Sequence, residues 1–270
     1  MSFQLPGASD VHVDRPLTNI SIAYIQKADG FVADRVFPRV PVSKQSDKYF
    51  EYDRGYWMRD EMKQRAPSTE SAGMNYGISS DGSYSCDVWA LHVDVADQVR
   101  SNADSPIAPD REAAELLAQQ ALLRKEKLFV SNFFGAGIWT SQLDGVAGAP
   151  AAGQFRRWDE AAATPIEDVR AAKRSVQTLT GFRPNKIVLG RAVYDALLDH
   201  PDIVGRVDRG QTNGSAVVMR QNVAALFELD DVLVMDAIEN TAAEGAANSF
   251  SFIGGKHALL VYAAPAPSIL

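Results

Sequence analysis

The sequence has little of what several classes of protein require. Among its 270 residues there is one cysteine, Cys86, so an intrachain disulfide and a cysteine-based metal site are both excluded, and a reducing cytosol is the expected compartment. Acidic residues outnumber basic ones, 34 to 27, and the net charge of −7 argues against a dedicated nucleic-acid-binding protein. No apolar run reaches the roughly 18–20 residues that a membrane span needs, and we expect no secretory signal.

The motifs of common catalytic sites are also missing. The sequence contains neither a Gly-x-x-x-x-Gly-Lys-Ser/Thr phosphate loop nor a Gly-x-Ser-x-Gly nucleophile motif. The four histidines are widely spaced, and Gly135-x-Gly137 follows a helical pattern without the third glycine of a dinucleotide-binding loop. Cys86 lies in an alternating apolar pattern, which favours a small core residue over a nucleophile. We therefore expect no enzyme, no cofactor and no metal ion.

What the sequence does contain is a long stretch, residues 29–74, that mixes aromatic residues with charges of both signs. It shows little helical period and no core of its own, so it cannot bury its aromatic side chains internally. Residues 48–53 predict an outgoing strand and residues 75–79 a returning one, which together predict a long two-stranded hairpin. Because an isolated hairpin is marginally stable in water, we expect the aromatic residues to be buried on another copy of the chain.

The middle of the chain has clearer periodicity. Residues 84–95 alternate and predict a strand with one buried face. A helix is predicted from about Asp110, with Gly135 and Gly137 ending it, and its length of about 25 residues corresponds to ~37 Å. The predicted apolar face of this helix consists of Ala114, Leu117, Ala118, Ala121, Leu122, Leu128 and Phe129.

A second strong pattern begins at residue 164. Thr164 is placed to cap a helix, Pro165 suits its first position, Glu167 completes a capping box and Gly181 ends it. The order of elements that follows predicts a compact α+β domain. Its predicted parts are strands at 186–189, 232–235, 250–253 and 258–262, short helices at 191–199 and 219–227, and a polar loop at 205–214.

Three blocks of sequence carry a family resemblance. Residues 35–42 read Arg-Val-Phe-Pro-Arg-Val-Pro-Val, residues 180–203 begin Thr-Gly-Phe-Arg-Pro-Asn-Lys-Ile-Val-Leu, and residues 226–234 precede the block Gly-Gly-Lys-His-Ala-Leu-Leu-Val-Tyr at 254–262. Together with the order of elements, these blocks resemble tailed-phage major capsid proteins of the HK97 fold. The likeness covers nearly the whole chain and implies an α+β, HK97-like capsid fold.

The resemblance implies a division of the chain into the parts of that fold. Because no long helical region precedes the arm, we expect a separate scaffolding protein. Relatives in this family often continue beyond the equivalent of Leu270. The implied parts are an N-terminal arm at 1–28, an extended loop at 29–83, a peripheral domain at 84–164 with its spine helix at 110–134, an axial domain at 165–252, and a return to the peripheral domain at 253–270.

The function implied by the resemblance is structural. The chain would assemble into pentamers and hexamers of an icosahedral shell around double-stranded DNA, in the host cytoplasm, with a portal and a cement protein as further partners and no membrane. One alternative of the same fold is an encapsulin-type nanocompartment. An alternative from another class is a small α+β enzyme, which would need converging catalytic residues.

Two groups of residues are predicted to make contacts. Arg156 and Arg157, beside Trp158, form a basic cluster suited to non-specific contact with packaged DNA, with a subunit contact as the alternative. At the hairpin tip, mixed charges beside aromatic residues are more typical of an interface with aromatic anchors than of a solvated loop. The predicted subunit-interface residues are Arg54, Tyr56, Trp57, Met58, Arg59, Asp60, Glu61, Lys63 and Arg65.

Overall fold

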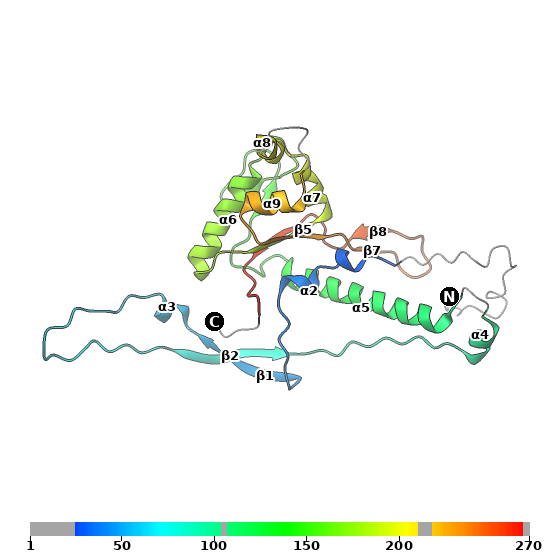
Figure 1. Cartoon of the computed structure of the whole chain (residues 1–270), viewed down its shortest axis with the longest axis horizontal. Helices are drawn as coiled ribbons and strands as arrows, with labels where there is room; N and C mark the ends of the chain where they lie inside the picture. The colour runs from blue at the N-terminus through cyan, green and yellow to red at the C-terminus, as the bar shows by residue number, and fades with distance from the viewer. Residues whose placement is uncertain (1–24, 104–106, 210–217, 267–270) are drawn as a thin grey trace. The chain divides into compact units, whose positions relative to one another are not determined.

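The structure is a computed structural model that describes residues 25–103, 107–209 and 218–266 (Figure 1). The chain divides into two compact units, and each is described here by itself. The hairpin unit consists of residues 40–91, and the core unit of the remaining described residues. Most of the implied N-terminal arm, residues 1–28, lies outside the described residues. No helix within the described ranges is long and apolar enough to cross a membrane.

The hairpin unit confirms the predicted two-stranded hairpin. Strand β1 (Ser46–Tyr52) pairs antiparallel with β2 (Ile78–Ser85), with Ser46 opposite Ser85 and Tyr52 opposite Ile78. The register shifts between Tyr49 and Glu51, which bends the ribbon locally. A single helical turn, α3 (Arg54–Trp57), follows β1. The returning strand was predicted too early, because pairing starts only at Ile78.

The strand predicted at residues 84–95 is wrong beyond Ser85, where β2 ends. Residues 86–96 form no regular element, and Val88 and Leu91 are largely exposed. Cys86 is exposed as well, so the expectation of a small core residue is also wrong. Alternation predicts a strand only if a second strand can pair with it, and no strand among the described residues pairs with this stretch.

The core unit is built on a three-stranded sheet with strand order β6-β5-β9. Strand β5 (Lys186–Gly190) runs parallel to β6 (Asp231–Met235) and antiparallel to β9 (Ala258–Val261). Helices α6 (Pro165–Thr180) and α5 (Pro109–Phe133) are the two longest helices of this unit. The lengths of the central strands and of both helices match the sequence predictions.

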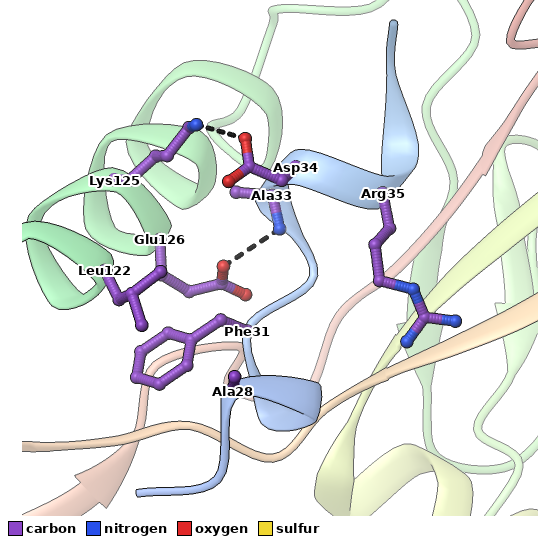
Figure 2. A pocket seen from close by; sticks show the side chains of 8 residues that line it. All are labelled: Ala28, Phe31, Ala33, Asp34, Arg35, Leu122, Lys125 and Glu126. Atoms are coloured by element: carbon purple, nitrogen blue, oxygen red, sulfur yellow. Dashed lines mark hydrogen bonds and ion pairs between the residues drawn. The ribbon is translucent and has the colours of Figure 1, made fainter. Parts of the chain in front are cut away.

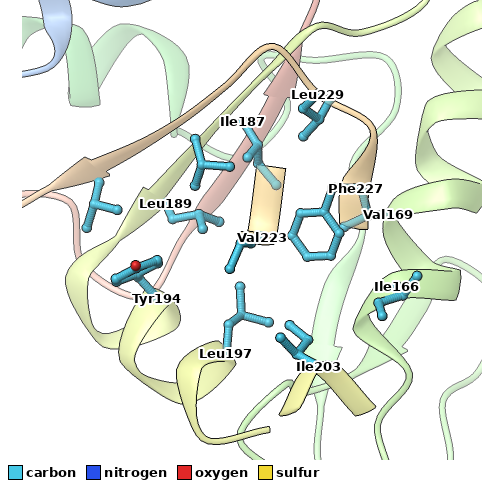
Figure 3. Packing of buried hydrophobic residues seen from close by; sticks show 12 residues of the cluster. Ile166, Val169, Ile187, Leu189, Tyr194, Leu197, Ile203, Val223, Phe227 and Leu229 are labelled. Atoms are coloured by element: carbon cyan, nitrogen blue, oxygen red, sulfur yellow. The ribbon is translucent and has the colours of Figure 1, made fainter. Parts of the chain in front are cut away.

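Both faces of this sheet are buried, and successive side chains of each strand point to opposite faces. Ile187 and Leu189 of β5 point into one cluster, as Figure 3 shows. This cluster also contains side chains from α6, α7 (Arg191–Leu198), α8 (Pro201–Arg209) and α9 (Arg220–Phe227). Val188 points to the opposite cluster, where it packs with Phe129 of α5 and Val36. The sheet is therefore the middle of three layers, which explains why its strands read as continuous apolar runs.

The remaining elements are short and complete the core unit. Their bounds are η1 (Ala28–Gly30), α2 (Ala33–Val36), α4 (Asp97–Asn102), β3 (Asp144–Val146), β4 (Gln154–Arg156), α7 (Arg191–Leu198), α8 (Pro201–Arg209), α9 (Arg220–Phe227), β7 (Ile238–Asn240) and β8 (Phe250–Phe252). Helix α8 occupies part of the loop predicted at 205–214, because His200-Pro201 starts a new helix rather than a coil.

Packing differs from the predictions at three further places. The stretch 29–74 does not lack a core throughout, because Phe31, Val32 and Val36 are buried in the core unit. On α5 the alanines of the predicted face are exposed, and the fully buried residue is Glu126. The predicted capping box is absent at α6, since the Thr164 side chain makes no cap bond and Glu167 instead accepts a hydrogen bond from Arg206 at 2.7 Å.

Candidate functional site

The hairpin unit gathers aromatic side chains on its own surface. Tyr52 at the end of β1 lies edge-on to Trp57 of α3, with ring centroids 5.9 Å apart. Tyr76, just before β2, is 6.2 Å from Tyr52 and 6.4 Å from Trp57. These three rings contact one another because α3 folds back over the strand ends, where Asp53 accepts a hydrogen bond from the Gly55 N–H at 2.8 Å.

This cluster does not bury its members. Trp57 remains 61% exposed, and Met58 and Tyr56 beside it are also exposed. Met62 is 93% exposed, and sequence reasoning missed it because an isolated methionine in a charged stretch carries no periodic signal. Soluble monomers rarely expose contiguous apolar surface of this kind, which makes the hairpin a candidate interface.

Two charged residues of the predicted interface, Arg59 and Glu61, lie beside these apolar side chains. The guanidinium of Arg59 lies 5.9 Å from the centre of the Tyr56 ring and 3.6 Å from the Glu61 carboxylate. The residues thus combine an apolar centre with paired charges, which is the arrangement of many protein interfaces. The structure brings Arg59, Tyr56 and Glu61 together, whereas Lys63 and Arg65 follow in an exposed stretch without regular structure.

The two arginines predicted to face DNA lie in and beside β4 of the core unit. Arg156 donates to the carbonyl oxygens of Gly148 at 2.8 Å and Ala162 at 3.2 Å, and lies 3.6 Å from the Glu160 carboxylate. Arg157 is half exposed and lies 3.4 Å from Asp159. Both positive charges are therefore countered within the chain, and Arg156 mainly holds its own loop in place.

A shallow depression of about 200 Å³ lies next to α5 in the core unit. It is lined by ion-paired and hydrogen-bonded side chains of the chain itself, among them Asp34, Lys125 and Glu126 (Figure 2). Within the described ranges, no three His, Cys, Asp or Glu side chains gather as a metal site would require. The hairpin is therefore the strongest candidate site.

Comparison with known proteins agrees with the capsid resemblance. The family model of phage major capsid protein E matches residues 153–267. The major capsid protein of Pseudomonas phage JBD67 is 29% identical over 93% of this chain and 77% of its own length. The major capsid protein of Burkholderia phage BcepMu is 23% identical over 84% of this chain and 69% of its own length.

Two solved structures share the fold. A phage-related protein from Bordetella bronchiseptica matches with a TM-score of 0.64 and 20% identity, over 90% of this chain and 75% of that one. The capsid structure of cyanophage P-SCSP1u matches with a TM-score of 0.55 and 13% identity, over 97% of this chain and 80% of that one. The fold is thus an α+β, HK97-like capsid fold.

The fold and the sequence relatives together point to the class of phage shell proteins. Both curated relatives are major capsid proteins of bacteriophages, and the matching family model is also one of phage capsid proteins. The sequence relatives and the fold support a phage major capsid protein over the nanocompartment alternative.

Proposed function

We propose that the chain assembles into the pentamers and hexamers of an icosahedral shell, and that the hairpin unit is the part that reaches a neighbouring subunit. The observation that carries this proposal is the exposure of Trp57, Tyr56 and Met58 on a two-stranded ribbon. Such a ribbon has no second layer of its own, so burial on another copy is the way to remove these side chains from water. The role is structural, with no catalytic step.

In this proposal each part of the fold has a place in the shell. The hairpin unit makes up most of the extended loop at 29–83, α5 is the spine helix of a peripheral domain, and the segment from α6 to β8 is the axial domain, with residues 253–270 returning to the peripheral domain. Residues 1–28 would form an N-terminal arm, most of which lies outside the described part of the chain. Repeated modest contacts in a closed shell give a stable whole.

Further partners follow from the same proposal. The enclosed genome would be double-stranded DNA, contacted non-specifically, and the exposed half of Arg157 is one candidate contact. An acidic chain suits this purpose, because a strongly basic inner wall would bind the genome too tightly to release it. A separate scaffolding protein, a portal and a cement protein would complete the particle, which would be assembled in the host cytoplasm.

A deletion at the hairpin tip tests the proposal. Replacing residues 54–71 with a short Gly-Ser linker removes the exposed side chains Tyr56, Trp57 and Met58 but leaves the core unit intact, so we expect a folded chain that does not form shells. The matched control deletes residues 67–72 only, which are polar and leave the predicted interface in place. Circular dichroism reports folding, and sedimentation with negative-stain microscopy reports shells. Normal shells from the longer deletion would contradict the proposal.

A further inference from the structure

The helix α2 is too short to be stable by itself. It has four residues, whereas isolated helices in water become stable only beyond roughly 12–15 residues. Val32, just before it, and Val36, its last residue, are 1% and 0% exposed and pack against Phe129 and the sheet. Tertiary contacts must therefore hold α2 in its helical form.

At its beginning, α2 is held by Glu126 of α5, which is fully buried. The carboxylate accepts hydrogen bonds from the Val32 N–H at 3.1 Å and from the Ala33 N–H at 3.0 Å. Figure 2 shows this side chain reaching from α5 towards the first residue of α2. These N–H groups have no partner within a helix, so the carboxylate satisfies donors that would otherwise be unpaired and buried.

At its end, α2 is held by Lys186, the first residue of β5. The ammonium donates to the carbonyl oxygens of Arg35 at 2.7 Å and Val36 at 3.2 Å. A negative charge at the start of a helix and a positive charge at its end both oppose the helix dipole favourably. Glu126 of α5 and Lys186 of β5 thus form hydrogen bonds to opposite ends of the same helical turn.

Two further ion pairs fasten the middle of α2. Asp34 pairs with Lys125 of α5, and Arg35 lies 3.5 Å from Asp231 of β6. The turn is therefore connected by side chains to α5, β5 and β6. This turn also lies close in sequence to the hairpin unit, because only Phe37, Pro38 and Arg39 separate α2 from Val40, where that unit begins.

We propose that Glu126 and Lys186 are positioning residues for assembly. Their hydrogen bonds to α2 hold in place the root of the hairpin unit, which we define as residues 37–39, the link between α2 and that unit. This inference rests on the proposed function of the hairpin. An interface segment whose root is fixed loses less conformational entropy when it docks, so it binds its neighbour more tightly. The hydrogen bonds of Glu126 and Lys186 therefore contribute to shell formation without touching the neighbouring subunit.

Three variants and one matched control test this role. Glu126→Met removes both carboxylate oxygens that accept hydrogen bonds from α2, whereas Glu126→Gln keeps one acceptor oxygen. Lys186→Met removes the ammonium group that donates both hydrogen bonds to the end of α2. The control is Lys173→Met, because Lys173, like Lys186, donates to carbonyl oxygens at a helix end, those of Phe227 at 2.6 Å and Glu228 at 3.0 Å. It fastens α9, not α2, so it reports the effect of losing a comparable cap elsewhere in the core.

Two readouts separate positioning from general stability. Trypsin cleavage after Arg39 and Lys44 measures how firmly the root is held, and the chain concentration at which half the material forms shells measures assembly. For Glu126→Met and Lys186→Met we expect faster cleavage at these two sites and a roughly tenfold higher assembly concentration, with a folded core by circular dichroism. We expect Glu126→Gln to recover part of both effects and Lys173→Met to change neither.

The possible outcomes distinguish this inference from the function on which it rests. A wild-type chain that forms no shells would overturn the proposed function, and this inference with it. Wild-type shells accompanied by unchanged assembly of Glu126→Met and Lys186→Met would overturn the inference alone. So would equal losses of assembly in Lys173→Met and Glu126→Met, because the effect would then be one of stability rather than of position.

Discussion

Trp57 offers the sharpest test of where the shell gains its stability. The side chain is 61% exposed in the subunit and contacts only its hairpin neighbours Tyr52 and Tyr76 among aromatic residues of the described chain. If its exposed part is buried on the adjacent subunit, Trp57→Ala removes that burial from every contact of the shell. The folding of the core unit should be unaffected, because no core cluster contains Trp57.

The size of the effect follows from the exposed area. A tryptophan buries up to about 250 Å², so the exposed part amounts to roughly 150 Å². At about 25 cal/mol per Å², complete burial would contribute about 4 kcal/mol per contact, which is an upper value. Immobilising side chains at the interface costs about 0.5–1.5 kcal/mol each, so we expect a net loss of about 2–3 kcal/mol for Trp57→Ala.

Assembly titrations followed by light scattering measure this loss directly. A loss of 2–3 kcal/mol corresponds to a roughly 30- to 150-fold weaker contact, which should abolish shells at concentrations where the wild-type chain assembles fully. Trp57→Phe keeps an aromatic ring and should assemble nearly normally. If Trp57→Ala formed shells at the wild-type concentration, Trp57 would not be buried between subunits and the proposed interface would be misplaced.

Two further predictions concern the core unit. Burial raises the pKa of the Glu126 carboxyl group and the nearby Asp34 adds to the rise, whereas hydrogen bonds from the N–H groups of Ala33 and Val32 lower it. Because the pKa is higher in the folded state than in the unfolded state, the free energy of unfolding should increase as the pH falls through the folded-state pKa towards 4.5. Urea titrations of Glu126→Gln should lack this increase, and an equal pH dependence in the two chains would contradict the prediction. At Gly190 an added methyl group would collide with the carbonyl oxygens of Gly254 and Gly255. Gly190→Ala should therefore lower the free energy of unfolding by about 1–3 kcal/mol or more, measured by thermal melts. An unchanged melting temperature would contradict this close approach of the two backbone segments.

The contrast between the two units has a physical basis. The core unit has a sheet covered on both faces, so its apolar side chains are buried within one chain. The hairpin unit has two strands and one helical turn, and every residue of β1 is exposed. In the proposed assembly, the chain folds its core first and completes the burial of its hairpin only in the shell, which would link folding of the subunit to growth of the particle.

The sequence by itself determined the elements whose signal is local. The period of residues 165–180 and the continuous apolar run Ile187-Val188-Leu189 predicted α6 and β5 because side-chain spacing reports which face of an element is buried. The hairpin was predictable for the same reason, and so was its exposed aromatic tip, since a charged stretch with scattered aromatic residues has no helical or strand face to bury.

Only the tertiary structure decided which segments meet. Glu126 has the sequence signal of a solvent-exposed helix residue, yet it is fully buried because its partners, the N–H groups at the start of α2, lie 93 and 94 residues earlier in the chain. Residues 86–95 alternate like a strand, but no strand among the described residues pairs with them, and the alanines of the face predicted for α5 stay exposed. Periodicity describes a face, whereas the presence of a partner for that face depends on contacts between residues far apart in sequence.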